Sequence, residues 1–122
     1  MSASDYLGTY AEGWTNGDAE TILKAVSDDY VLDDPNAGQI TKEDFKEYLE
    51  KLKETVESLR GDASEPQFMA LSEVVTLEES GGLTAWCWWS VPGTSIQGGG
   101  LIKVNADGVS SERLTYYTKL PG

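Results

Sequence analysis

The chain has 122 residues, 39% of them hydrophobic, and its formal net charge is −12, from 21 acidic and 9 basic residues. These values predict one folded domain over residues 1–122, with no nucleic acid and no anionic membrane as partner, because both bind through a basic face. The sequence has no histidine, which excludes a Ser-His-Asp or Cys-His triad and removes the commonest zinc ligand. We therefore expect neither a metal nor a cofactor. No apolar run approaches a membrane span and residues 1–10 lack a secretory pattern, so we expect a cytoplasmic protein.

Two short helices are predicted at the N-terminal end of the chain. Ser4 and Asp5 can cap the first helix, which runs to about Trp14 with Tyr10 on the same apolar stripe. A polar turn then interrupts the pattern, and Asp18 can cap a second short helix. Packing of the apolar stripe is expected to hold the first helix against the rest of the domain.

A strand of alternating apolar residues follows and ends in two carboxylates and a proline. Because residues two apart share a face, Tyr30, Leu32 and Asp34 point to one side of this strand, and Asp33 points to the other. Pro35 favours an extended backbone at Asp34. Two interpretations of Asp34 remain open. It is either a solvated turn residue or a carboxylate enclosed by apolar side chains, whose ionised form is then disfavoured and which can exchange protons near neutral pH.

The longest predicted helix begins after Thr41 and Asp44, which resemble a capping box, and ends near Arg60 with Gly61 as its stop. Its apolar residues repeat at helical spacing: Phe45, Tyr48, Leu49, Leu52, Val56 and Leu59. The charged residues between them are interpreted as a solvated face.

After this helix the apolar period changes to two. Four strands are predicted, over residues 67–78, 83–91, 95–104 and 109–118. The short Gly-rich connections favour an antiparallel meander. Helices followed by strands predict an α+β domain, in which three N-terminal helices pack on one face of a curved, mainly antiparallel sheet.

Two segments inside these strands have unusual composition. The first, residues 86–89, places Trp86 and Trp88 on one face and Cys87 and Trp89 on the other. We expect Trp86 and Trp88 to line a pocket and Trp89 to meet another subunit; a well-packed core is the alternative. The second, Gly98-Gly99-Gly100 in mid-strand, indicates a bend or a close approach of another group to the backbone.

The order of these elements resembles the nuclear-transport-factor-two-like superfamily, which includes ketosteroid isomerases, polyketide cyclases and limonene epoxide hydrolases. The resemblance runs from about Tyr6 to Thr118. It implies a cone whose open end receives a small apolar molecule, and a homodimer formed through the outer sheet face. Because this scaffold supports many chemistries, the resemblance indicates the fold more strongly than the reaction.

Ketosteroid isomerase is the most similar member in detail. Tyr10 falls where that enzyme has its oxyanion-binding tyrosine, and Asp34 falls where it has its proton-transferring carboxylate. Its second oxyanion acid falls near Gly100, and a glycine has no side chain that can donate a hydrogen bond.

Arg113 is the third candidate catalytic residue. By alternation it shares a face with Thr115 and Tyr117, whose family counterparts line the cone. An inward arginine needs a counter-charge, so we expect it to pair with Asp34, as in the epoxide hydrolase branch. The alternative is that the strand parity is shifted by one residue, or a bulge intervenes, and Arg113 lies on the surface.

The resulting prediction is proton-transfer chemistry on an apolar, oxygen-bearing small molecule, of the isomerase, cyclase or hydratase type. The catalytic candidates are Asp34, Tyr10 and Arg113. The expected ligand-binding residues are Trp14, Tyr30, Leu32, Phe45, Tyr48, Met69, Trp86, Trp88 and Tyr117. Two alternatives remain open: a non-catalytic module that binds such ligands, and a dimeric protein-interaction domain.

Overall fold

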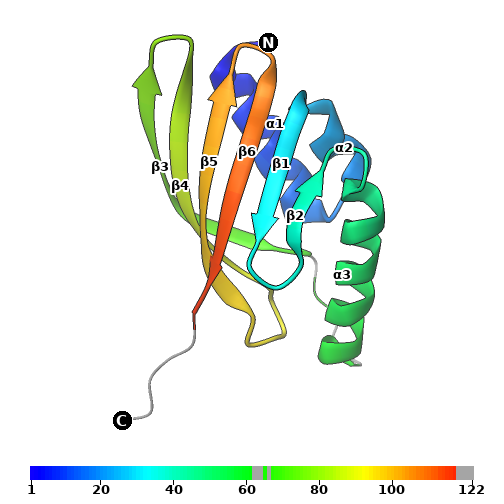
Figure 1. Cartoon of the computed structure of the whole chain (residues 1–122). Helices are drawn as coiled ribbons and strands as arrows, with labels where there is room; N and C mark the ends of the chain where they lie inside the picture. The colour runs from blue at the N-terminus through cyan, green and yellow to red at the C-terminus, as the bar shows by residue number, and fades with distance from the viewer. Residues whose placement is uncertain (62–64, 66, 118–122) are drawn as a thin grey trace.

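A computed structural model describes residues 1–61, 65 and 67–117 of the chain (Figure 1). The helices are α1 (Ala3–Asn16), α2 (Ala19–Lys24) and α3 (Phe45–Arg60). The strands are β1 (Val26–Asp34), β2 (Gly38–Thr41), β3 (Ala70–Glu79), β4 (Gly82–Ser90), β5 (Gln97–Asn105) and β6 (Gly108–Tyr116). The end predicted for the last strand, at Thr118, lies outside the described residues.

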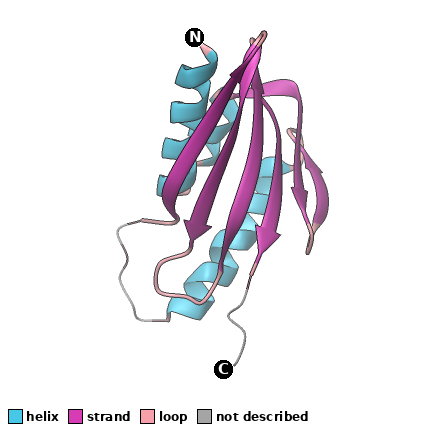
Figure 2. Ribbon diagram, turned by 90° about the vertical axis from the view of Figure 1, so that its left-hand side faces the viewer, coloured by secondary structure: helices cyan, strands magenta, loops and turns pink. Residues whose placement is uncertain are grey.

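The strands form one curved, open sheet in the order β2-β1-β6-β5-β4-β3. Strands β3 to β6 are paired antiparallel, as the short Gly-rich turns predict. Strand β1 is parallel to β6 and forms an antiparallel hairpin with β2. Neither pairing can be predicted from the residue pattern of the strands themselves. All three helices pack on one side of the sheet (Figure 2). This arrangement confirms the predicted α+β class.

Local chemistry explains where each helix begins and ends. Helix α1 is capped by Ser2 rather than by the predicted Ser4, because Ser2 and Asp5 exchange side-chain to backbone hydrogen bonds in a capping box. Asp18 caps α2 as predicted, by accepting from two backbone N–H groups of that helix. At Gly61 the backbone N–H donates to the Glu57 carbonyl and ends α3, also as predicted.

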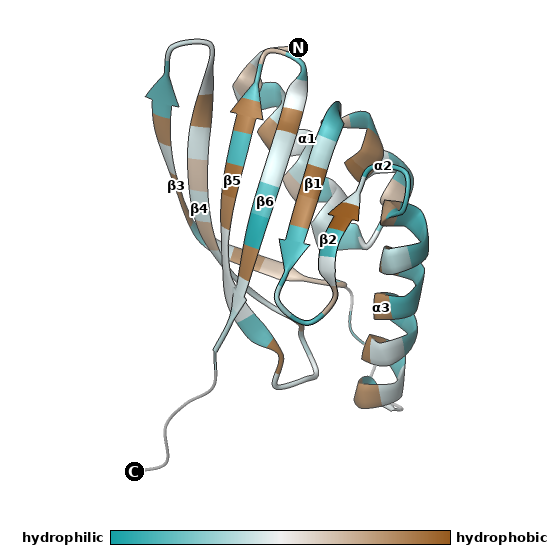
Figure 3. Ribbon diagram, in the orientation of Figure 1, coloured by the Kyte–Doolittle hydropathy of each residue, from teal (hydrophilic) through white to brown (hydrophobic). Residues whose placement is uncertain are grey.

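The predicted capping box at the start of α3 is wrong. Asp44 is the N-cap residue, but its side chain accepts no hydrogen bond from the backbone of the helix. Thr41 is instead the last residue of strand β2, three residues before Asp44. Hydrophilic residues cover much of the outward face of α3 (Figure 3), in agreement with the solvated face expected there.

The core lies between the helices and the inner sheet face. Four aromatic rings pack edge to face within it, with centroids 5.7 to 6.3 Å apart: Tyr10, Trp14, Tyr30 and Phe45. Such contacts add to the free energy of burial alone. Within the described part of the chain, no helix is both long and apolar enough to cross a membrane.

The inward and outward faces of β1 agree with the sequence prediction. Tyr30, Leu32 and Asp34 are buried, whereas Val31 and Asp33 are partly exposed. The prediction for β4 is wrong by one residue. Its buried side chains are Leu83, Ala85, Cys87 and Trp89, and Trp86 and Trp88 lie on the outer face. Apolar residues occupy both faces near Trp86, so alternation alone cannot identify the inner face there.

Strand β6 changes face at a β-bulge. Val104 pairs with Val109, but the preceding Lys103 pairs with Ser111, so Ser110 is the extra residue. An extra residue reverses the alternation beyond it, because successive side chains point to opposite faces. The bulge therefore turns Glu112 inward and Arg113 outward.

Candidate functional site

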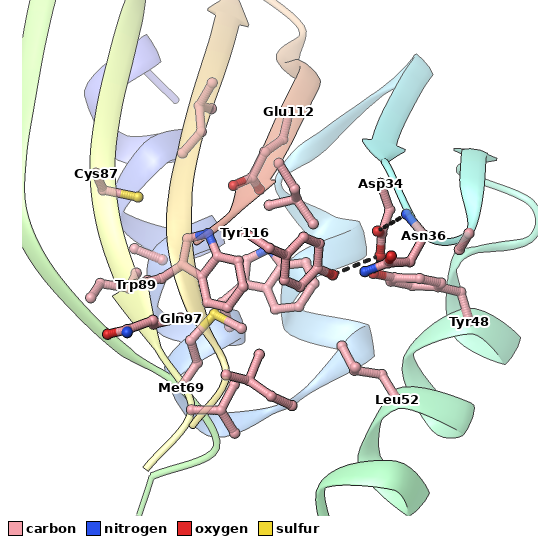
Figure 4. Close-up of a pocket in the computed structure, with 18 of the residues that line it drawn as sticks. Asp34, Asn36, Tyr48, Leu52, Met69, Cys87, Trp89, Gln97, Glu112 and Tyr116 are labelled. Carbon is pink, nitrogen blue, oxygen red and sulfur yellow. Dashed lines mark hydrogen bonds between the residues drawn. The ribbon is translucent and has the colours of Figure 1, made fainter. Parts of the chain in front are cut away.

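A cavity of about 570 Å³ lies between the inner sheet face and helices α1 and α3 (Figure 4). Most of its lining is apolar. Several of its lining residues are exposed to solvent, among them Lys51, Thr55 and Tyr117. Asp34 and Glu112 are the acidic side chains that line it among the described residues.

The predicted site residues divide into three groups. Those that line the cavity are Tyr10, Trp14, Asp34, Tyr48, Met69 and Tyr117. Those that are buried in the core without lining the cavity are Tyr30, Leu32 and Phe45. Those that lie on the outer sheet face are Trp86, Trp88 and Arg113. The predictions for the last group are wrong. The parity of β4 places Trp86 and Trp88 on the outer face, and Arg113 lies on that face beyond the bulge in β6.

Asp34 stands at the end of β1, where only 3% of it is exposed. The backbone N–H of Asn36 donates to Oδ1 over 2.9 Å. The hydroxyl groups of Tyr48 and Tyr116 donate to Oδ2 over 2.6 and 3.0 Å. These residues come from the turn after β1, from the first turn of α3 and from the end of β6, so three elements hold one carboxylate.

The two tyrosines at Asp34 remain hydrogen-bond donors. Burial raises the pKa of Tyr48 well above its ordinary value, and the hydrogen bond to Asp34 and the charge of Asp34 raise it further. The pKa of Tyr116 is raised by the same causes, with burial again the largest. Both hydroxyls are therefore protonated throughout the neutral range.

Arg113 does not pair with Asp34, contrary to the sequence prediction. Its Nε lies 3.9 Å from Oδ2 of Asp33, and both side chains are exposed to solvent. An exposed pair at this distance contributes little to stability. Arg113 does share a face with Thr115, as alternation predicts, but beyond the bulge at Ser110 this is the outer face of β6 and not the inner one.

Glu112 occupies the inward position that the sequence prediction assigned to Arg113. Only 5% of the residue is exposed. Tyr10 donates its hydroxyl proton to Oε1 over 2.5 Å, and the hydroxyl oxygens of Tyr10 and Tyr30 lie 2.7 Å apart. Burial raises the pKa of Glu112 to about 7, against the lowering effect of the Tyr10 hydrogen bond. Burial, followed by the charge of Glu112, also raises the pKa of Tyr10 and of Tyr30.

The glycines of β5 make room for side chains on the neighbouring strands. A Cβ added at Gly100 would collide with Oε2 of Glu112, and one added at Gly99 would collide with the ring of Trp86. The close approach predicted for this segment is therefore confirmed. The resemblance to ketosteroid isomerase placed a second acid near Gly100 on β5. In this chain an acid stands beside that glycine, but it projects from β6.

The hydrogen bonds leave one oxygen of Glu112 without a partner among the described residues. When the carboxyl is ionised, Tyr10 uses its single proton toward Oε1, and the Tyr30 hydroxyl donates to Tyr10. Oε2 makes no such bond and can carry the acid proton when the carboxyl is neutral. Since the pKa of Glu112 is about 7, this carboxyl offers the cavity a donor below neutral pH and an acceptor above it.

The lining residues that sequence reasoning missed include Glu112, Tyr116, Cys87 and Trp89. The signal that points to Glu112 is the glycine opposite it, Gly100 on β5. This signal can be recognised only when the register between β5 and β6 is known. Burial, followed by the charge of Glu112, raises the pKa of Cys87 to about 12, so its thiol stays protonated. The described residues contain no cluster of three or more acidic or cysteine side chains suited to a metal ion.

Asp34 and Glu112 lie on diagonal positions of the inner sheet face. Leu32 pairs with Glu112 across the parallel β1–β6 ladder, and Asp34 is two residues further along β1. The arrangement brings two carboxylates to one largely apolar cavity, each in contact with tyrosine hydroxyl groups. Such a pair can take a proton at one point of a bound molecule and supply one at another.

No family model matches the sequence, and no curated protein is similar to it in sequence. Solved structures are similar to nearly the whole chain. An NTF2-like protein of unknown function from Cytophaga hutchinsonii has a TM-score of 0.66 at 12% identity, over 96% of this chain and 91% of that one.

Two candidate polyketide cyclases are also similar in structure. The one from Xanthomonas campestris pv. campestris has a TM-score of 0.60 at 16% identity, over 96% of this chain and 90% of its own. The one from Pseudomonas putida has a TM-score of 0.60 at 16% identity, over 98% and 93%. At these identities the similarity is one of fold, and the fold expected from the order of elements is confirmed.

Proposed function

We propose that this chain, which has the NTF2-like α+β fold, binds a small, largely apolar molecule in its cavity and transfers a proton on it. Asp34 is the proposed base and Glu112 the proposed acid. The observation that carries the proposal is the placement of two buried carboxylates in one cavity, with no ion pair to either among the described residues.

The proposed step is the removal of a proton from a carbon next to a carbonyl group. Asp34 takes the C–H proton, the electron pair moves toward the carbonyl oxygen, and Oε2–H of Glu112 donates to that oxygen as charge develops. One such donor is worth about 3–4 kcal/mol of transition-state stabilisation. Return of the proton at another carbon gives an isomer, and attack of the enolate on a second carbonyl gives a ring.

Tyr10 has a different role in this proposal from the one the resemblance implies. Its proton is directed to Glu112 and not to a substrate oxygen. Tyr10 and Tyr30 are therefore positioning residues, which orient the carboxyl of Glu112 so that Oε2 is the oxygen left for the ligand.

Asp34→Asn tests the proposed function, with Asp33→Asn as a matched control on the outer face of the same strand. Enones, epoxides and cyclisable polycarbonyl compounds are the substrates to screen. We expect Asp34→Asn and Glu112→Gln each to reduce kcat about 100-fold or more, since positioned proton transfer contributes roughly 10²–10⁴-fold, and Asp33→Asn to retain most activity. Equal activity in Asp34→Asn and Asp33→Asn would remove Asp34 from the mechanism.

A non-catalytic binding module is the second candidate function. One observation favours it: both oxygens of Asp34 already accept hydrogen bonds, from Asn36, Tyr48 and Tyr116. These donors make Asp34 less available to a substrate proton. Ligand binding that survives Asp34→Asn, without turnover of any screened compound, would support this function.

We further propose that two copies of the chain associate through the outer sheet face. Side chains exposed there include Val75, Leu77, Trp88 and Leu101, from β3, β4 and β5. A contiguous exposed apolar patch is typical of an interface, and a two-fold contact would cover it on both copies. The sequence prediction assigned Trp89 to this face, but Trp89 is buried inside.

Sedimentation velocity at micromolar concentration tests the association. We expect a dimer that Leu101→Asp converts to a monomer, because the two-fold contact would bury one aspartate charge from each copy in an apolar interface. Ser58→Asp, on the exposed face of α3, is the control and leaves the dimer intact. A monomeric unsubstituted chain at this concentration would contradict the proposal.

A further inference from the structure

One oxygen of Glu112 is open to the cavity and has no hydrogen-bond partner among the described residues. Glu112 is 5% exposed, its carboxyl group projects from β6 into the cavity (Figure 4), and Tyr10 donates to Oε1. Oε2 lies over Gly100, whose missing Cβ leaves it room. Unlike the indole nitrogens of Trp14 and Trp89, Oε2 is not sealed off by the atoms around it. A ligand atom can therefore reach it.

The groups that surround this carboxyl are neutral or acidic. The titratable ones that lie near it or line the same cavity are Tyr10 from α1, Tyr30 and Asp34 from β1, Tyr48 from α3, Cys87 from β4, and Tyr116 and Tyr117 from the end of β6. Burial raises the pKa of Glu112 to about 7, against the lowering effect of the Tyr10 hydrogen bond. The carboxyl is thus ionised above neutral pH, in a site that does little to stabilise its charge.

The basic side chains nearest to this carboxyl do not neutralise it. Lys103 and Arg113 are exposed on the outer sheet face. Lys51 lines the cavity, but it is exposed and pairs with Glu47. The described residues therefore provide no ion pair for Glu112. Because a buried carboxylate without a counter-charge is costly, a ligand that supplies one is favoured.

The chemistry of the cavity restricts which ligand group suits Oε2. An anion would be repelled by two carboxyl groups in a largely apolar space. An alcohol supplies a donor but leaves the carboxylate without a counter-charge. An ammonium group supplies both. A tertiary ammonium has a single N–H, which matches the single carboxylate oxygen without a partner, and it buries no further donor that would need an acceptor.

Two other features of the molecule favour a cationic ligand. The aromatic residues that line the cavity are Tyr10, Trp14, Tyr48, Trp89, Tyr116 and Tyr117. The face of an aromatic ring attracts an organic cation, and most strongly where water is excluded. The formal net charge of −12 also raises the concentration of cations near the chain.

We propose that the cavity binds small hydrophobic tertiary amines in their protonated form, through an ion pair and hydrogen bond to Oε2 of Glu112. The inference goes beyond the proposed function, in which protonated Glu112 donates to the oxygen of a neutral substrate. The two proposals share the cavity alone, because amine binding uses the ionised carboxylate and needs no turnover. Amines of this class are therefore expected to compete with the substrate.

The probes for the test are 2-(dimethylaminomethyl)naphthalene and 2-isobutylnaphthalene, which have the same shape. The protonated nitrogen of the first is a carbon in the second. Calorimetry on the full chain gives both affinities. At pH ~8 we expect the amine to bind about tenfold more tightly, the value of one hydrogen bond to a charged group. At pH ~5.5 its affinity should be about tenfold lower than at pH ~8, because Glu112 is then largely protonated. The affinity of the hydrocarbon should not change with pH.

Substitution of Glu112 gives a second readout. Glu112→Gln keeps the shape of the side chain and removes its charge, so the affinity for the amine at pH ~8 should fall about tenfold. The affinity for the hydrocarbon should change less than twofold. Glu57→Gln, on the exposed face of α3, removes the same charge outside the cavity and should change neither.

A ¹³C titration of the Glu112 carboxyl in the unsubstituted chain gives a third readout, which does not depend on any variant. Bound amine should lower the pKa of Glu112 below its value of about 7 in the free chain, because affinity and ionisation are linked.

Several results would overturn this inference. These are no binding of either probe, equal affinities for both at pH ~8, no effect of amine on the pKa of Glu112, and equal losses in Glu112→Gln and Glu57→Gln. A loss of amine affinity in Asp34→Asn without one in Glu112→Gln would also overturn it. Turnover that depends on Asp34, without amine binding, removes this inference alone. Amine binding at Glu112, with activity unaffected by Asp34→Asn, removes the proposed proton transfer alone.

Discussion

The two carboxylates of the cavity differ in how many donors surround them. Asp34 accepts one backbone N–H and two tyrosine hydroxyl groups, which replace the water lost on burial. Glu112 accepts one hydroxyl group, from Tyr10, and burial raises its pKa to about 7. Two acidic groups within one cavity thus lie in different environments. Unequal environments of this kind are how a site obtains both a base and an acid.

The position of each carboxylate on its strand explains this difference. Asp34 is the last residue of β1, where the chain turns and the backbone N–H of Asn36 becomes free to donate. Glu112 is in the middle of β6, where ladder hydrogen bonds occupy the neighbouring backbone groups. A strand end therefore supplies donors that a strand interior does not.

The largest expected difference between the two carboxylates is in how Glu112 makes the unfolding free energy depend on pH. The pKa of Glu112 is raised from 4.5 to about 7 in the folded chain, so its contribution is complete below pH ~4.5 and is lost as pH rises through ~7. Glu112→Gln removes this loss. Between pH ~4.5 and ~8 the unfolding free energy of the unsubstituted chain should decline relative to the variant by about 3 kcal/mol.

Urea unfolding across this pH range is the measurement. Glu57→Gln, on the exposed face of α3, is the control and should follow the unsubstituted chain at every pH. Parallel curves for Glu112→Gln and the unsubstituted chain would show that burial does not raise the pKa of Glu112 in the folded chain.

A smaller effect is expected at the glycine beside Glu112. Gly100→Ala places a Cβ against Oε2 of Glu112, and the carboxyl must move. We expect a loss of about 1–3 kcal/mol of unfolding free energy, the typical cost of overpacking, and loss of any activity that depends on Glu112.

Gly99→Ala is the matched control, because its Cβ would collide with the ring of Trp86 on the outer face. It should lower stability by a similar amount and leave activity per folded molecule unchanged. Equal activity loss in both variants would show that Gly100 affects the site only through general stability.

The smallest expected effect concerns the tyrosines. Tyr10→Phe removes the hydrogen bond that lowers the pKa of Glu112, so that pKa should rise further above 7. Tyr48→Phe removes a donor from Asp34 and should leave the pKa of Glu112 unchanged. A ¹³C titration of the Glu112 carboxyl group measures both. An unchanged pKa in Tyr10→Phe would mean that Tyr10 does not orient the acid.

Much of the fold and one half of the site could be predicted from the sequence, because the relevant signals are local. The order of the elements other than β2, which the sequence prediction missed, the cap at Asp18 and the stop at Gly61 follow from periodicity and from residues within one turn. Asp34 was placed on the inner face of β1 because an uninterrupted strand preserves alternation from Tyr30 onward.

The other half of the site was decided by tertiary structure. A single bulge at Ser110 exchanges the faces of Glu112 and Arg113, and nothing in the surrounding residues indicates it. At the bulge β6 pairs with β5 on one side and with β1 in parallel on the other, and both registers shift there. Sequence periodicity describes one strand at a time, whereas the face a residue occupies depends on pairing between strands that are distant in the chain. That dependence is why Glu112, and not Arg113, enters the cavity.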